Sequence, residues 1–414
     1  MDATAEKPFV GGLSLRLSAV GEYLLMLLVV FYSATWCLYT SANCNTALRW
    51  ALPLLAALIL LRFHRIPARL WQRVAVTAVY LAVYILATRY NGVRFVLYFA
   101  LPLLLLMLYT GLVGDGAASL LCKLSDVVAL LTAVSLFFFL FGTVLGWIPP
   151  SSVTTFYWGE SWRTCPTYFH LYYEAQRIRF FGVDLPRNCG VFPEAPGFAA
   201  FLVVAAAAEV LLRRRPRWGR CGLFAAATLT TLSAKALILT AAVFALRYAL
   251  WMPQGWRARR GRVAALPILG VGLTAAAGVL LWDKLQTVSG GMRLDDVAAC
   301  LKAFRTAPIF GTGYWNDASI VPYFSYPDRY NDGLSMGLAV LLAQGGLYLS
   351  TLYWRPAVGC IRRAHPRRGW LSLVLIYTGL LLTGNITYHF LTLLLIAVFS
   401  AVGRERAYDR SELA

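Results

Sequence analysis

The chain has 414 residues, of which 59% are hydrophobic and only 14% are charged. A soluble domain usually has about a quarter of charged residues, so this composition excludes an ordinary water-soluble enzyme. Apolar runs of about 15 to 25 residues follow one another along the chain. This pattern is typical of an all-α polytopic integral membrane protein.

The formal net charge of +19 invites a nucleic-acid-binding interpretation, but the positions of the arginines argue against it. The arginines gather in short segments between apolar runs, and no soluble module remains to bind nucleic acid. Short basic loops are typical of the cytoplasmic side of a membrane protein and favour anionic lipid head groups of the bilayer. Four such clusters lie within residues 62–73, 213–220, 257–262 and 362–368.

With every basic cluster inside, the apolar runs predict one transmembrane domain over residues 1–414. It has about twelve helices, and both termini are cytoplasmic. The first run lacks a small-residue cleavage site after it, which indicates a retained span rather than a signal peptide. The expected spans lie near 19–40, 47–62, 73–88, 93–113, 124–147, 189–212, two within 221–251, 263–282, 334–354, 370–384 and 388–403.

Two long loops, 148–188 and 283–333, fall on the outer side in this topology, and both are rich in Tyr, Trp, Asp and Gly. Sugar rings stack on aromatic faces and form hydrogen bonds with acids and amides at their rim. The loops therefore favour carbohydrate binding. For any single aromatic residue, an interfacial aromatic belt is the alternative interpretation.

The eight cysteines show no spacing typical of a metal site, and we expect no metal and no bound cofactor. Cys165 and Cys189 fall in the same outer loop. They either form a disulfide or remain free, buried thiols, and the second alternative is favoured.

The stretch RNCGVFPEAPGFAAFL, residues 187–202, begins an apolar run with groups that membranes disfavour. Arg187 lies at the outer mouth of the span, and Glu194 lies about two helical turns further on. Ionisable groups at this depth cost about 3 kcal/mol, so they usually face a cavity or a partner. Together with a helix N-terminus opened by prolines, the stretch predicts a small anion site. The alternative is a capped helix start whose arginine reaches lipid phosphate.

The same stretch resembles the R-x-x-G-x-F-x-E-x-G-x-x-A/Q-x-x-L segment of the O-antigen polymerase and ligase superfamily, especially of bacterial exopolysaccharide and capsule polymerases. Three further segments resemble the family's motifs, in the family's order: TTLSAKALILTAAVFAL, MRLDDVAACLKAFRTAPIFGTGYWND and YNDGLSMGLAVLLAQGGLYLS. The four segments lie within residues 187–351, about two fifths of the chain.

The resemblance implies a GT-C-like glycosyltransferase of the bacterial inner membrane, with a metal-independent site that opens outward. Its substrate would be an oligosaccharide linked to polyprenyl diphosphate, and a chain-length regulator is a possible partner. Two arginines of the family are thought to hold the diphosphate, and by position these are Arg187 and Arg293. Lys235 would add a third cation, because the ligases often have a polar or basic residue there. Such cations would stabilise the departing phosphate.

Ligases commonly have a histidine after the large loop, where this chain reads Tyr330, Asn331 and Asp332. This difference favours a polymerase over a ligase. The acceptor hydroxyl must still lose a proton, and Glu194 and Asp332 are the candidate bases, followed by Asp317. The other expected substrate-binding residues are Asn188, Tyr314, Trp315, Tyr330 and Asn331, with Asp317 also in this group.

Four further residues have alternative interpretations. Asp295 and Asp296 follow Arg293 closely and are candidate salt-bridge partners for it. His170 and His389 are expected on the outer side as interfacial histidines.

The sequence therefore predicts a polymerase that joins lipid-linked repeat units into a surface polysaccharide. A ligase of the O-antigen type is the close alternative. A flippase or secondary transporter is the alternative from another class, because about twelve spans with both ends inside suit a carrier. The unusual charges map to the outer edge rather than to the middle of the membrane, which favours the enzyme.

Overall fold

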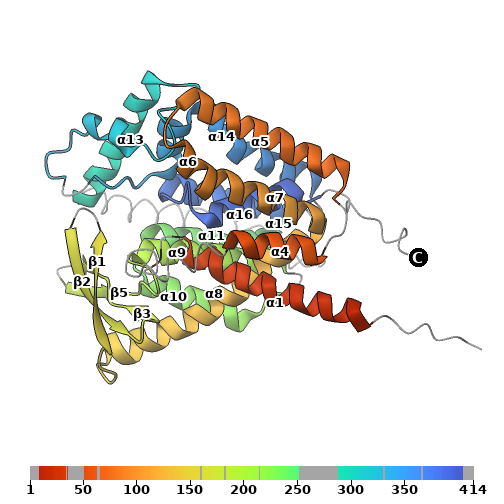
Figure 1. The fold of residues 1–414 in the computed structure, drawn as a ribbon. Coiled ribbons are helices and arrows are strands. Elements are labelled where there is room, and N and C mark those ends of the chain that lie inside the picture. Colours follow the sequence, from red (N-terminus) through yellow and green to blue (C-terminus); the bar gives the residue numbers. More distant parts are fainter. Residues whose placement is uncertain are drawn as a thin grey trace, which may run out of the picture.

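The computed structural model describes residues 9–33, 35, 51–62, 66–158, 161–180, 183–213, 215–250, 288–329, 332–364 and 367–403. These residues form a bundle of helices with a small β module at one end (Figure 1). The expected predominantly helical fold is therefore confirmed, although five strands among the described residues make the chain not purely α. The expected span at 263–282 lies outside the described residues, as do Tyr330 and Asn331.

Most helices coincide with the apolar runs, but α13 lies within the segment 283–333 that the sequence predicts as a loop, and α1 begins ten residues before the expected span 19–40. Before the strands come α1 (Phe9–Phe31), α4 (Ala51–Arg62), α5 (Ala68–Thr88), α6 (Gly92–Phe95), η1 (Val96–Ala100), α7 (Leu101–Val113), η2 (Gly114–Ala117), α8 (Ala118–Phe138) and η3 (Phe139–Val144). After the strands come α9 (Ala195–Ala207), η4 (Ala208–Leu212), α10 (Trp218–Thr230), α11 (Ala234–Leu250), α13 (Val288–Thr306), η5 (Asp317–Ser319), η6 (Val321–Tyr323), α14 (Gly337–Arg363), α15 (Arg367–Thr383) and α16 (Phe390–Ala401).

Four helical segments among the described residues are long and apolar enough to cross a membrane: Ala68–Thr88, Gly92–Val113, Ala118–Val144 and Ala195–Leu212. Helix α5 exposes Val76, Val79 and Leu86, whereas α9 is almost entirely buried. Exposed aliphatic rows are tolerated where lipid covers them. Helix α5 thus has a surface suited to lipid, and α9 lies at the centre of the bundle. The count of about twelve spans and the cytoplasmic termini stay predictions.

The bundle has two chemically different ends. At one end, which we call the basic end, the fully buried Glu209 and its neighbour Asp126 bind a cluster of arginines. These are Arg213 and Arg217, from the connection between η4 and α10, and Arg220, from the first turn of α10. This network ties α8 to α9 and α10. The opposite end carries the strands and α13, and we call it the strand end (Figure 1).

The turn between α10 and α11 covers residues 231–233. It divides the apolar run 221–251, in which the sequence predicts two short spans. Thr231 also receives a hydrogen bond from Arg187, so this turn belongs to the strand end.

The segment 148–188, expected as a long loop, contains two antiparallel sheets. Strands β1 (Ser152–Trp158), β2 (Ser161–Tyr168) and β3 (Tyr172–Tyr173) form one sheet, and β4 (Gln176–Phe180) pairs with β5 (Val183–Arg187). The β-branched and aromatic residues of SVTTFYW suit a pleated strand. The ring of Tyr168 packs on Gly142, where an added Cβ would lie 2.5 Å from it. The sheets are therefore docked on the end of α8, and the last strand ends at Arg187.

Helix α14 is broken in its middle, where Gly346 has a left-handed backbone (φ +61°). Residues 308–313 run beside the break and are hydrogen-bonded to it. The amides of Leu347 and Tyr348 donate to Pro308 O and Ile309 O, and those of Thr312 and Gly313 donate to Ala343 O and Gln344 O. The backbone groups freed by the break are thus satisfied, as an apolar environment requires. Two segments singled out in the sequence, PIFGTG and AQGGLYLS, form one interlocked unit.

We expect Gly346→Ala to lower the stability of the protein by about 3 kcal/mol or more. An alanine there would be strained by the positive φ, and its Cβ would lie 2.3 Å from Ile309 O. The measurement is thermal unfolding of the purified protein in detergent.

Gly222→Ala is the matched control, because Gly222 lies in α10 with no atom within 4 Å of an added Cβ. It should be neutral or stabilising by up to about 1 kcal/mol. Equal effects of the two substitutions would contradict the interlocked unit.

Candidate functional site

Arg187 ends β5 and is held mainly by neutral acceptors. Its Nε donates to Thr231 O at 2.8 Å, and its Nη1 donates to Gln176 Oε1 at 3.2 Å. Gln176 is the strand partner of Arg187, and the same oxygen accepts from Ala195 N at the start of α9. Only 9% of Arg187 is exposed, and it forms no ion pair within the described part of the chain. A hairpin, a helix start and a helical turn thus fix one guanidinium.

Asn188 is fully buried, and its amide is engaged within the protein. Its Nδ2 donates to Thr230 Oγ1 at 3.0 Å, while Oδ1 accepts from Ser135 Oγ and from Gly190 N. The backbone N–H of Asn188 also donates to Thr230 O. In the structure, Asn188 anchors the Arg187 segment to α8 and α10, and its expected contact with substrate stays a prediction.

Arg293 lies in the second turn of α13, and its side chain is partly buried. Its Nε is buried without a hydrogen-bond partner. The two acids that follow it, Asp295 and Asp296, pair with Arg329 instead, so the proposed ion pairs with Arg293 are not formed. A guanidinium with a buried, unused donor is open to an anionic partner.

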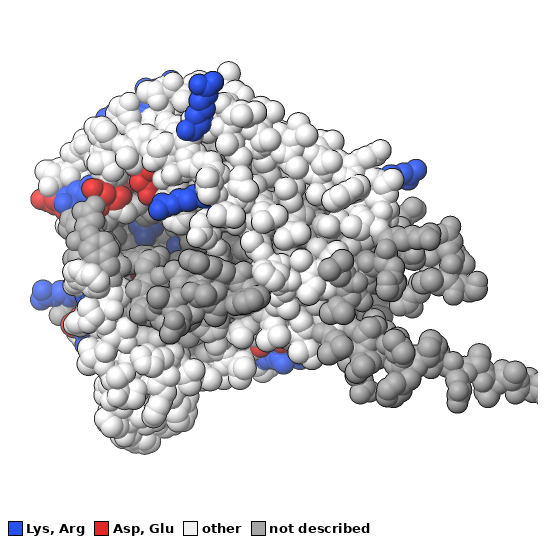
Figure 2. All heavy atoms as spheres, viewed as in Figure 1, with Lys and Arg blue, Asp and Glu red and all other residues white. Residues whose placement is uncertain are grey.

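The charges of Arg187 and Arg293 act on each other. Burial is the main reason that the pKa of Arg187 is lowered, and the positive charge of Arg293 lowers it further. Cys189 and Glu194 act in the opposite direction. Figure 2 shows Lys and Arg side chains set back in a hollow at the strand end. Like charges repel, and an anion bound near both would relieve the repulsion.

Lys235, the third expected cation, is the second residue of α11 and lies one helical turn beyond Thr231. Its Nζ packs against Gly384 in the turn between α15 and α16, where an added Cβ would lie 2.4 Å away. In the same turn, burial and the charge of Lys235 lower the pKa of His389 to about 4. His389 is therefore neutral at neutral pH. The structure thus places Lys235 beside the 384–389 turn, near the residue that binds Arg187.

The three carboxylates proposed as bases have different surroundings. Glu194 is the N-cap residue of α9, but its side chain makes no capping bond, and its charge acts on Arg187. Asp332 is partly buried in the loop that follows Arg329. Burial raises the pKa of Asp317, and a hydrogen bond of 2.7 Å from Gln344 Nε2 offsets part of this effect. A raised pKa makes Asp317 a stronger base than an exposed carboxylate.

The two aromatic candidates differ in exposure. Tyr314 is 1% exposed and packs with Phe95, Phe99 and Tyr388, so its ring is part of the core. Trp315 is 54% exposed and touches the same cluster only at its rim. Trp315 is therefore the member of this pair whose face is open to a sugar ring.

The cysteines and acids of the described residues offer no metal centre. No group of three or more His, Cys, Asp or Glu side chains is placed there to hold a metal ion. Cys165 and Cys189 are separate, buried free thiols rather than a disulfide. Burial raises the pKa of each to about 12, so neither is a reactive thiolate at neutral pH.

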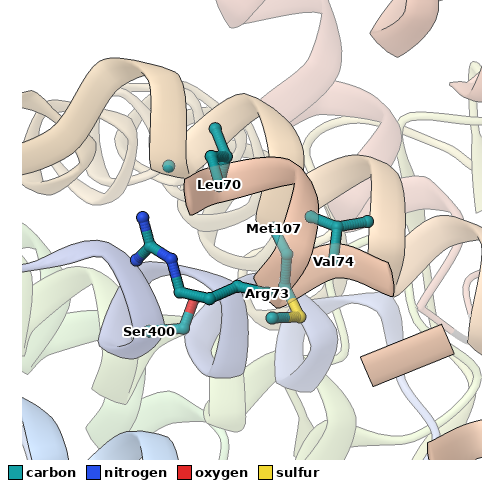
Figure 3. A pocket seen from close by; sticks show the side chains of 6 residues that line it. Leu70, Arg73, Val74, Met107 and Ser400 are labelled. Carbon is teal, nitrogen blue, oxygen red and sulfur yellow. The ribbon is translucent and has the colours of Figure 1, made fainter. Parts of the chain in front are cut away.

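A small cavity of about 30 Å³ lies away from these residues, between α5, α7 and α16 (Figure 3). It is lined by Leu70, Arg73, Val74, Met107, Gly111 and Ser400. Its volume is that of about one water molecule, so it is too small for a sugar or a diphosphate.

Sequence reasoning missed several residues that build the site, above all Gln176, Thr231 and Arg329. A hairpin was foreseeable from the alternating segment QRIRFFGVDLPR with its central glycine. That hairpin would have placed Gln176 opposite Arg187. The partners of Thr231 and Arg329 depend on contacts between distant segments, which no local pattern reveals.

Comparison of the chain with protein-family models, with curated proteins and with solved structures finds no match.

We expect Asn188→Ala to destabilise the protein by about 3 kcal/mol, because it removes a buried amide and leaves Ser135 and Thr230 without their partner. Thermal unfolding in detergent measures this loss. Asn385→Ala is the control, since Asn385 is exposed and makes one hydrogen bond, to Leu334 O. It should cost less than about 1 kcal/mol. Unchanged stability of the Asn188 variant would contradict its role as a structural anchor.

Proposed function

We propose that this protein is a membrane glycosyltransferase that joins lipid-diphosphate-linked oligosaccharide units into a longer glycan. The observation that supports this most strongly is the Arg187–Arg293 pair. Both guanidinium groups lie at the strand end, their charges interact, and neither forms an ion pair with a described carboxylate. A diphosphate carries the charge and the acceptor oxygens that such a pair binds best.

In the proposed reaction, the hydroxyl oxygen of the acceptor sugar bonds to the anomeric carbon of the donor. The bond from that carbon to the diphosphate oxygen breaks, and the lipid diphosphate leaves with the bonding electron pair. Attack from the opposite side inverts the anomeric carbon. The two arginines stabilise the charge that develops on the departing oxygen, so the step requires no metal ion.

The hydroxyl proton passes to a carboxylate. Of the three candidates, Glu194 is the one whose charge acts on the pKa of Arg187. Asp317 has the raised pKa that favours a base, and Asp332 lies in the loop tied to α13. The reaction requires one of these three, and the exposed ring of Trp315 gives the sugar a stacking surface.

The location of the site suits a substrate with a long lipid tail. The strand end lies at the tip of the apolar bundle, where a head group meets water while its tail stays among exposed aliphatic side chains. The basic clusters at the other end would face the cytoplasm, so the proposed site opens to the outside of the bacterial inner membrane. The ligase variant of this reaction would use the same arginine pair with a different acceptor.

The direct test supplies the purified protein with lipid-linked repeat units, without nucleotide sugar and with metals chelated. We expect a ladder of longer glycans on a gel. Arg187→Ala or Arg293→Ala should reduce the rate by about 100-fold or more, because each removes charge stabilisation of the leaving group.

Arg305→Ala is the control on the same helix, because Arg305 is exposed in the last turn of α13. It should retain the ladder. A ladder that survives both Arg187→Ala and Arg293→Ala would refute the proposal.

A further inference from the structure

A compact ionic cluster lies directly beside Arg293. Arg329 Nη1 donates to Asp295 Oδ2 at 3.2 Å, and its Nη2 donates to Asp296 Oδ1 at 2.7 Å. The two carboxylates are 6% and 1% exposed, so the cluster is shielded from water. Arg329 thus forms ion pairs with both acids of the MRLDD segment.

Both acids also bind the two ends of the loop that carries Arg329. Asp295 accepts from Ser325 N and Oγ, and Asp296 accepts from Ser335 N and Oγ. We call the described residues 325–329 and 332–335 the clasp loop. The guanidinium of Arg329 further stacks over the ring of Phe324, 3.3 Å from its centre. The clasp loop is therefore fixed to the first half of α13.

Because both acids pair with Arg329, neither of them neutralises the charge of Arg293. Asp296 follows Arg293 at i+3 on a helix, a spacing at which opposite charges normally pair. In the structure, each acid is instead saturated by serine donors and by Arg329. Burial acts to raise the pKa of Asp295, but the bonds from Ser325 and Tyr326 and the charge of Arg329 outweigh it and hold that pKa below its usual range. Asp295 is therefore ionised at neutral pH, and loss of Arg329 would leave its negative charge without its ion-pair partner.

We propose that Arg329 is a positioning residue that engages Asp295 and Asp296 and thereby keeps Arg293 available for an anion. The inference deepens the proposed function and rests on it for the identity of the anion as a diphosphate. The buried Nε of Arg293 has no hydrogen-bond partner, and Asp296, which lies at i+3 on the same helix, binds Arg329 and Ser335 instead of Arg293.

The test compares Arg329→Gln with the triple variant Arg329→Gln/Asp295→Asn/Asp296→Asn in the full-length protein. Two readouts are used. One is the rate at which phenylglyoxal, a reagent for accessible arginines, modifies Arg293, followed by mass spectrometry of its peptide. The other is the affinity for inorganic pyrophosphate. Arg305→Gln serves as the control variant on the same helix.

We expect Arg329→Gln to lower both the modification rate and the pyrophosphate affinity by about tenfold, since the released Asp296 would pair with Arg293 from its i+3 position. The triple variant should return both to within about threefold of the wild type, because asparagines carry no charge. If Arg329 served only to hold the clasp loop, the opposite result would be expected. The modification rate and the pyrophosphate affinity of the triple variant would then be as low as those of Arg329→Gln, or lower. That result would overturn the proposal, as would unchanged reactivity in Arg329→Gln.

Arg329→Lys keeps the test decisive if the glutamine variant does not fold. A lysine reaches one carboxylate at a time, so it should give an intermediate loss of reactivity, and no loss would count against the proposal. The phenylglyoxal readout is independent of the substrate. If reactivity follows the expected pattern while the wild type fails to bind pyrophosphate, Arg329 has the inferred role and the proposed function is wrong.

Discussion

The organisation of the strand end depends on two arginines of like charge that are close enough to interact and are opposed by no ion pair among the described residues. Removing a guanidinium from water without a charged partner is costly, and a second one nearby adds repulsion. Neutral acceptors reduce that cost for Arg187, while the Nε of Arg293 stays unsatisfied. Such local instability is typical of sites that bind a ligand of opposite charge.

Rigid elements from distant parts of the chain hold this pair in place. The β4–β5 hairpin carries Arg187, and Gln176 and Thr231 fix its guanidinium to the start of α9 and the end of α10. The clasp loop braces α13, which carries Arg293. Residues 308–313 interlock with the broken helix α14, so the chain that follows α13 is anchored as well. Precision of this kind suits a site that must orient a flexible, lipid-linked substrate.

Much of this architecture was predictable from the sequence. Apolar runs mark the helices because a helix satisfies its own backbone in lipid, and the hairpin of α10 and α11 follows from a run too long for one span. The strands β1 and β2 were missed, since their aromatic, polar segment lacks a clear alternation, whereas the alternating segment of β4 and β5 could have been predicted as a hairpin. The partners of Asp295 and Asp296 were assigned to the nearest arginine in sequence, whereas Arg329 reaches them from more than thirty residues away. Local spacing limits which side chains can pair, but tertiary packing decides which of them do.

The most direct test of the arginine pair is the thermal stability of the protein in detergent with and without inorganic pyrophosphate, compared with that of Arg293→Gln. If repulsion between Arg187 and Arg293 destabilises the empty site, Arg293→Gln should unfold at a higher temperature than the wild type. Pyrophosphate should then stabilise the wild type and leave the variant unaffected. A variant that is less stable than the wild type, or that responds equally to pyrophosphate, would contradict this account.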